Sequence, residues 1–224
     1  MLAPTLEAFD VAVPATATTG RAISLPGRLS LPTPPVGLVL FAHGSGSSRW
    51  SPRNAQVAAT LHEAWIGTLL FDLLTEQEAE DRVNVFDIDL LAERVLAAVR
   101  YVGGLEATRH LPLGLFGAST GAAAALVAAA REPRVTAVVA RGGRPDLAGG
   151  RLRSVRVPTL LIVGGADDQV RGLNERAAAE LAGEKHVAVV PGASHLFEEP
   201  GALAAAATLA AEWFARHLHV EPAR

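Results

Sequence analysis

The stretch Leu113-Gly114-Leu115-Phe116-Gly117-Ala118-Ser119-Thr120-Gly121 decides the fold that the sequence predicts. It begins with a short apolar run, Leu113 to Phe116, which is typical of a strand buried on both faces. From Thr120 to Arg131 the chain is rich in alanine and stops before a proline, as expected of a helix. Ser119 therefore lies at a sharp strand-to-helix turn, where neighbouring residues must be small and the hydroxyl is raised above the sheet.

The same alternation of strand and helix continues on both sides of this stretch. Short apolar runs predict further strands at residues 38–42, 68–71, 135–140, 160–163 and 187–190. Helical periodicity and capping residues predict helices at about 51–62, 87–102, 173–181 and 201–218. Such repetition predicts an α/β fold, with a mostly parallel central sheet flanked by helices on both faces.

The remaining segments are expected to lie at the edge of this core. Residues 1–35 are rich in proline and threonine and predict edge strands and turns. The acidic segment from Glu76 to Asp81 predicts a solvated loop. No repeat or linker divides the chain, so we expect one domain over residues 1–224, with its catalytic core at 36–219.

Two candidate catalytic residues follow Ser119 in the sequence, each just past the end of a predicted strand. A serine hydroxyl is a poor nucleophile and needs a base, which in turn needs an orienting carboxylate. Asp167 and Asp168 compete for the carboxylate role, and the spacing of the flanking glycine and valine favours Asp167. His195 is the candidate base. We therefore expect a catalytic triad of Ser119, Asp167 and His195; the alternative is a tight turn that carries an incidental serine.

A loop of small residues ends the first central strand and is a candidate oxyanion hole. His43-Gly44-Ser45 follows the strand at 38–42. Backbone N–H groups at such a loop and just after the nucleophile can bind a developing oxyanion. We assign these two donors to Ser45 and Thr120, and expect the ring of His43 to be bonded within the loop. The alternative is that residues 44–48 form only a flexible loop.

Composition excludes several classes of function. The 224 residues are 50% hydrophobic and 19% charged, which is enough for a full core, and the net charge of −3 argues against nucleic-acid and anionic-membrane partners. The absence of cysteine excludes disulfides, zinc-thiolate sites and a cysteine nucleophile. The N-terminus lacks the pattern of a signal peptide, so we expect a cytoplasmic protein, monomeric or homodimeric. No metal-ligand spacing is present, and surface positions are expected for His62, His186, His217 and His219.

Together these motifs resemble the α/β-hydrolase superfamily and, within it, the dienelactone-hydrolase-like branch. The resemblance spans roughly residues 37–218 and is carried by Phe41-Ala42-His43-Gly44-Ser45-Gly46, Phe116-Gly117-Ala118-Ser119-Thr120-Gly121, Gly164-Gly165-Ala166-Asp167 and Pro191-Gly192-Ala193-Ser194-His195-Leu196-Phe197. It implies an enzyme that hydrolyses an ester or lactone through an acyl-enzyme, without a metal or an organic cofactor. Dienelactone hydrolases proper use a cysteine nucleophile, so the serine here favours a different carboxylic ester. Some proteins of this kind are joined to a phosphoribosyltransferase domain.

Features around the predicted site bear on the substrate. About eighteen residues separate the strands at 135–140 and 160–163, which leaves no room for a large lid and predicts an open, shallow site for a small-molecule ester. Arg141 directly follows a strand and could pair with a substrate carboxylate, with Arg49 and Arg53 as further candidates. The alternative is that these arginines bond to aspartates and carbonyls of neighbouring loops.

These observations predict a serine carboxylesterase in which His195 removes the Ser119 proton and Asp167 orients the imidazole. The same residues are also compatible with two alternative functions. One is a binding or regulatory protein that shares the fold without catalysis. The other is an acyltransferase or perhydrolase that uses the same triad on a different acceptor.

Overall fold

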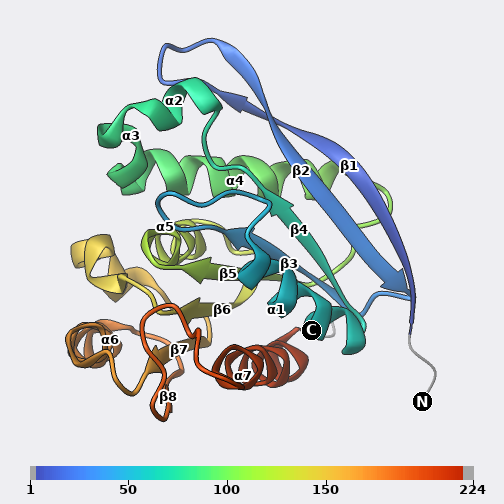
Figure 1. Cartoon of the computed structure of the whole chain (residues 1–224). Coiled ribbons are helices and arrows are strands. Elements are labelled where there is room, and N and C mark those ends of the chain that lie inside the picture. The colour runs from blue at the N-terminus through green and yellow to red at the C-terminus, as the bar shows by residue number, and fades with distance from the viewer. Residues whose placement is uncertain (1–3, 219–224) are drawn as a thin grey trace.

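The computed structural model describes residues 4–218 and is built around one eight-stranded sheet in the order β1-β2-β4-β3-β5-β6-β7-β8 (Figure 1). The strands are β1 (Thr5–Thr16), β2 (Ala22–Thr33), β3 (Gly37–Ala42), β4 (Ile66–Phe71), β5 (Leu113–Ala118), β6 (Val135–Arg141), β7 (Thr159–Gly164) and β8 (Lys185–Val190). Strands β3 to β8 run parallel to one another, whereas β2 is antiparallel to both β1 and β4. The expected mostly parallel sheet is confirmed.

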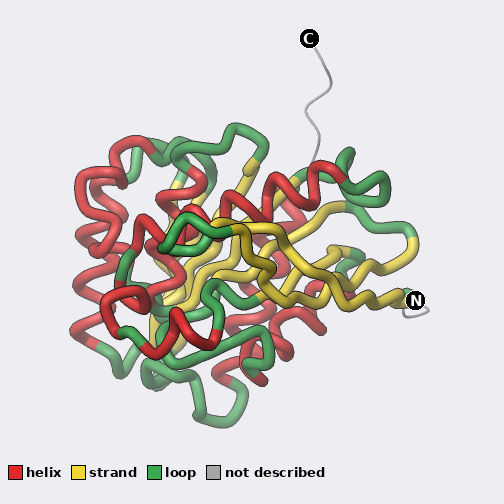
Figure 2. The backbone as a smooth tube through the Cα atoms, turned by 90° about the horizontal axis from the view of Figure 1, so that it is seen from above, coloured by secondary structure: helices red, strands yellow, loops and turns green. Residues whose placement is uncertain are grey.

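Helices cover both faces of the sheet (Figure 2). They are α1 (Pro52–Glu63), α2 (Glu76–Glu80), α3 (Arg82–Phe86), α4 (Ile88–Gly104), α5 (Thr120–Ala129), the 3₁₀ helix η1 (Pro145–Ser154), α6 (Asp168–Glu180) and α7 (Ala202–His217). Side chains of β3 alternate between the faces, because successive residues of a strand point in opposite directions. Leu38 and Leu40 pack in the cluster with α4 and α5, whereas Val39 and Phe41 pack with α1 and α7.

The N-terminal segment forms two strands joined by a turn at one edge of the sheet, as expected. Strands β1 and β2 each contain twelve residues and form one long antiparallel hairpin. Val13 of β1 and Leu25 of β2 pair with one another, and both are fully buried. Pro14 lies in β1, the edge strand, where an N–H group is not required for a further strand, and Pro26 and Pro32 of β2 lie outside the residues 27–30 that pair with β4.

The acidic segment at 76–81 is not the expected solvated loop. It forms the short helix α2, whose start is stabilised by a capping box between Thr75 and Glu78. The carboxylate of Glu78 is buried and accepts a 2.7 Å hydrogen bond from Arg94 of α4 and one of 3.1 Å from the backbone of Thr18. Arg94 also donates to the carbonyl of Thr16. One carboxylate of this segment thus joins the hairpin to α4 inside the protein, whereas Glu76, Glu80 and Asp81 are exposed.

Smaller differences concern helix α6 and two histidines. Helix α6 begins at Asp168, five residues before the expected start, because Asp167 caps it. His62 and His217 are half-buried rather than on the surface, and His62 hydrogen-bonds Thr68 at 2.8 Å. His219 lies outside the described residues.

The strand order places the functional site. The chain passes from β3 to β4 on one side and from β5 to β6 on the other, so the connections after β3 and β5 lead in opposite directions from the carboxyl edge of the sheet. The connection from β6 to β7 holds only η1, and the described residues include no large lid. Within this part of the chain, every helix is too short or too polar to cross a bilayer.

Candidate active site

Ser119 occupies the turn between β5 and α5 in a strained backbone conformation. Its φ of 51° and ψ of −122° lie in a region that non-glycine residues rarely adopt, at a cost of about 1–3 kcal/mol. The turn is fixed by its backbone: the carbonyl of Ser119 accepts N–H groups from Ala122 at 3.1 Å and Arg144 at 3.0 Å. The Ser119 side chain makes no capping hydrogen bond to α5, so its hydroxyl is not held by the helix.

Glycines around this turn allow a close approach of neighbouring backbone. A Cβ atom on Gly121 would lie 2.5 Å from the His43 carbonyl oxygen, and one on Gly44 would lie 2.9 Å from the Cβ of Ser119. Real Cβ atoms do not approach other atoms so closely without a shift of the structure. The small residues of both motifs therefore let the loop after β3 lie directly against the candidate nucleophile.

His195 and Asp167 meet at the same edge of the sheet. The Nδ1 atom of His195 lies 2.8 Å from Oδ2 of Asp167, while Oδ1 of the same carboxylate accepts the backbone N–H of Val170 at 3.3 Å. Asp168 instead has an exposed side chain that pairs with Arg171. With Nδ1 engaged by the carboxylate, Nε2 is the ring nitrogen of His195 left for another partner. The structure thus places Asp167, and not Asp168, beside the histidine.

The loop that carries His195 is held close to β7. A Cβ atom on Gly164 would lie 2.6 Å from the carbonyl oxygen of Ser194, so glycine is needed at this strand end. The backbone N–H of Ser194 donates to Glu199 at 3.0 Å, and this hydrogen bond lowers the pKa of the Glu199 carboxyl. The backbone just before His195 is therefore held against β7 on one side and by Glu199 on the other.

The two residues that carry the candidate oxyanion donors, Ser45 and Thr120, are hydrogen-bonded to one another. The backbone N–H of Ser45 donates to Oγ1 of Thr120 at 3.0 Å. The Thr120 side chain is buried, and its residue begins α5, whose N-terminal N–H groups point out of the helix. The hydroxyl bond to Ser45 was not anticipated from the sequence, where only the amides were considered.

The ring of His43 is bonded within this loop and across to the next strand. Its Nε2 accepts the backbone N–H of Leu73 at 3.1 Å, so its Nδ1 carries the proton and donates to the Gly44 carbonyl at 3.0 Å. Burial lowers the pKa of His43, an effect that exceeds the opposing influence of the Gly44 hydrogen bond and the Asp72 charge. A neutral His43 therefore fastens the loop after β3 to the segment after β4.

The three candidate arginines differ in their surroundings. Arg49 pairs with Asp72, which also accepts the Arg49 backbone N–H at 2.7 Å. Arg49 therefore bonds to an aspartate of a neighbouring loop, which was the alternative to substrate binding. Arg53 lies 3.7 Å from the exposed Glu198. Arg141 is buried, and its Nε and Nη1 atoms have no hydrogen-bond partner among the described residues. The structure brings Arg53 and Arg141 to the cavity that contains Ser119 and His195.

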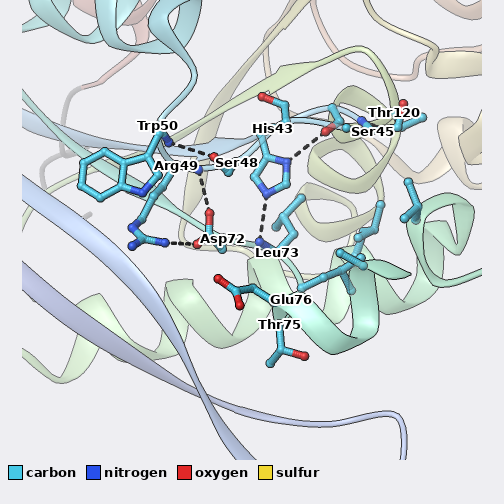
Figure 3. A pocket seen from close by; sticks show the side chains of 17 residues that line it. His43, Ser45, Ser48, Arg49, Trp50, Asp72, Leu73, Thr75, Glu76 and Thr120 are labelled. Atoms are coloured by element: carbon cyan, nitrogen blue, oxygen red, sulfur yellow. Dashed lines mark hydrogen bonds and ion pairs between the residues drawn. The ribbon is translucent and has the colours of Figure 1, made fainter. Parts of the chain in front are cut away.

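Two cavities flank the loop at 43–48. The first, of about 210 Å³, contains Ser119 and His195 and is bordered by the start of α1. The second, of about 310 Å³, lies on the α4 side and has the Arg49–Asp72 pair, Trp50 and His43 along its wall (Figure 3). The linings share Gly44, Ser45 and Ser47. The sequence analysis did not identify Asp72 as a site residue, although Asp72 directly follows β4 and residues at strand ends often line such sites.

Comparison with known families shows which family this chain belongs to. Residues 35–213 match the model of the alpha/beta hydrolase domain, which covers most of the chain. The chain is an α/β-hydrolase. A crystal structure of dienelactone hydrolase from Anabaena variabilis is 51% identical, with a TM-score of 0.89 over 96% of this hydrolase and 99% of that chain. This likeness confirms the dienelactone-hydrolase-like assignment.

More distant structures share the fold of this α/β-hydrolase. The esterase domain of a Rhodothermus marinus protein is 21% identical, with a TM-score of 0.74 over 95% of this chain and 100% of that one. Est1E from Butyrivibrio proteoclasticus, with ferulic acid bound, is 17% identical, with a TM-score of 0.76 over 92% and 98%. At this level of identity the likeness concerns the fold.

A curated relative carries a different name. A Mycobacterium tuberculosis protein named provisionally as a phosphoribosyl transferase is 57% identical over 198 residues, which are 88% of this hydrolase. The α/β-hydrolase spans only 44% of that protein's length. The name describes the whole protein, more than half of which has no counterpart in this alignment.

Proposed function

We propose that this α/β-hydrolase is a serine hydrolase that cleaves a carboxylic ester or lactone through an acyl-enzyme on Ser119. The observation that carries the proposal is the His195–Asp167 contact of 2.8 Å at the cavity that also contains Ser119. The strained turn at Ser119 adds support, because such strain is retained where a side chain must be presented in a fixed direction. The hydrolase and esterase names among the structural relatives agree with it.

In the proposed reaction, Nε2 of His195 takes the proton of the Ser119 hydroxyl as Oγ bonds to the substrate carbonyl carbon. The carbonyl oxygen becomes an oxyanion, which the backbone N–H groups of Ser45 and Thr120 bind. For this, the Ser45 N–H must turn from the Thr120 hydroxyl to the oxyanion or share its hydrogen between them. The tetrahedral intermediate then expels the alcohol, which leaves with the proton from His195. Water repeats the sequence on the acyl-enzyme and releases the acid.

Turnover of an activated neutral ester, p-nitrophenyl acetate, tests this proposal. We expect Ser119→Ala to lower kcat/KM by a factor of at least ~10³, because the nucleophile and its base act as a unit. Ser154→Ala is the matched control, since Ser154 is exposed at the end of η1. Equal rates in wild type and Ser119→Ala would overturn the proposal.

A fluorophosphonate probe gives an independent readout of the same group. It forms a covalent bond only to a serine that an adjacent base activates. Labelling of the wild type and of Ser154→Ala, and its loss in Ser119→Ala, is the expected result. A folded wild-type protein that does not react would favour a binding role without catalysis.

A further inference from the structure

The guanidinium of Arg141 lies buried beside the candidate nucleophile without a counterion. The residue is 7% exposed, and its Nε and Nη1 atoms have no hydrogen-bond partner among the described residues. Burial, with a smaller contribution from the nearby charge of Arg53, lowers its pKa to about 10, so the group remains charged at neutral pH. Arg141 ends β6, and the cavity that it lines also contains Ser119 and His195.

Such an arrangement is costly unless something else binds the group. Removing a charge from water without a partner costs several kcal/mol, which is why buried charges are normally paired. The other buried arginine, Arg94, follows this rule and bonds to Glu78. The Phe197 ring lies 5.7 Å from the Arg141 guanidinium carbon, a contact that attracts the cation and leaves its N–H donors without acceptors.

The rest of the cavity is also suited to an anion. Among the described residues that line it none is acidic, and Arg53, which lies 3.7 Å from the exposed Glu198 outside the lining, contributes a second positive charge. The cavity also meets the N-terminus of α1, a twelve-residue helix that begins at Pro52 and has no acidic residue in its first turn. The partial positive charge of that helix end is therefore not offset by a carboxylate of its own. A buried guanidinium, a second cation and a helix N-terminus all favour negative charge at this position.

We propose that the substrate of this hydrolase carries, besides its scissile ester, an anionic group that Arg141 binds, with Arg53 at the mouth of the cavity. The shared chemistry of that group is a planar or tetrahedral oxyanion, either carboxylate or phosphate, which the guanidinium fork can bind through two N–H donors. The cavity of about 210 Å³ limits the anionic part to a small one. This inference rests on the proposed serine hydrolase function and names the class of ester on which it acts.

Matched ester pairs test the inference. On the alcohol side, 3-acetoxybenzoate and 3-acetoxyphenyl phosphate are compared with neutral methyl 3-acetoxybenzoate. On the acyl side, mono-4-nitrophenyl adipate is compared with 4-nitrophenyl methyl adipate. We expect the wild type to favour at least one anionic ester over its neutral partner by ~10–100-fold in kcat/KM, as charge-assisted hydrogen bonds do. The pair that shows the preference identifies carboxylate or phosphate as the anion.

Variants at Arg141 assign the preference to its guanidinium. Arg141→Gln should bring the ratio of kcat/KM for the anionic ester to kcat/KM for the neutral ester close to one, and Arg141→Lys should retain part of the preference because a point charge replaces the fork. Arg156→Gln removes an exposed arginine ahead of β7 and should leave the preference unchanged. If Arg141→Gln does not fold, the ratio measured for Arg141→Lys and Arg53→Gln decides the matter.

Two results would overturn the inference. One is a wild type that hydrolyses both members of every pair equally. The other is an Arg141→Gln variant that slows both members by the same factor, which would indicate a structural role. A wild type that neither hydrolyses the neutral esters nor reacts with the fluorophosphonate probe would instead overturn the proposed function itself. Loss of the anion preference is thus distinguished from the absence of serine hydrolase activity.

Discussion

Replacing Asp167 by asparagine separates its two contacts. One oxygen of Asp167 caps α6 by accepting the Val170 N–H, and the other accepts Nδ1–H of His195. In Asp167→Asn the amide oxygen keeps the cap, because asparagine is as good an N-cap as aspartate. The amide NH₂ then faces Nδ1 and donates to it, which moves the imidazole proton to Nε2. A protonated Nε2 cannot take the hydroxyl proton of Ser119.

The expected cost is therefore kinetic rather than structural. We expect kcat for p-nitrophenyl acetate to fall by ~10⁴, the size of effect that a wrong imidazole tautomer produces, which corresponds to about 5.5 kcal/mol. The free energy of unfolding in urea should change by less than about 1 kcal/mol. Asp167→Ala should lose activity to a similar extent and also lose about 1 kcal/mol of stability with the cap.

Asp168→Asn is the matched control for this prediction. Its side chain is exposed and pairs with Arg171 one turn along α6, so both kcat and stability should stay near wild type. The reasoning is refuted if Asp167→Asn keeps more than about a tenth of the activity. It is equally refuted if Asp168→Asn is the variant that loses activity.

Three further predictions concern the frame around the site. Arg94→Met should lower the free energy of unfolding by about 3–5 kcal/mol, because it leaves the Glu78 carboxylate buried and unpaired, and adding Glu78→Met should recover part of this in urea denaturation. Burial lowers the folded-state pKa of His43, so the unfolded chain takes up its proton first as the pH falls below about 6.5. Stability should therefore fall there by up to about 1.4 kcal/mol per pH unit, and His43→Asn should show a shallower slope in denaturation measured from pH 7 to 5. Gly121→Ala should destabilise by at least about 2 kcal/mol, because the new Cβ meets backbone oxygens that cannot move aside, whereas Gly150→Ala, with open space around it, should stay within about 0.5 kcal/mol.

The sheet and the place of the candidate triad were predictable because their signals are local. Ser119 stands between a buried strand and a helix, and His195 follows another strand, so chain order alone places both at the carboxyl edge. The choice between Asp167 and Asp168 rested on spacing, and the structure now shows which carboxylate faces the imidazole. The local sequence pattern was enough to predict the position of a side chain wherever that position depends on the end of a single strand.

Features that depend on distant partners were not predictable in this way. Glu78 belongs to an acidic run that looks solvated until Arg94, sixteen residues later, is placed against it. The exposed fraction of Arg141 depends on what α1 and the His195 loop bring to it, and its lack of a carboxylate partner is a property of the folded chain. Burial and pairing of charge are set by tertiary packing, which a one-dimensional pattern does not record.

The loop at 43–48 separates two compartments that are lined largely by different parts of the chain. Apart from the three shared residues of the loop, one compartment is lined from the start of α1 and the ends of β5 and β6, and the other chiefly from the segment after β4 through α4. Outside the shared residues, each side chain lines one compartment alone, although the neighbours Ser119 and Thr120 line one compartment each. Under the proposed function, the two halves of an ester that occupied both compartments would contact different residues, while Gly44 of the loop stays constrained by its contact with Ser119.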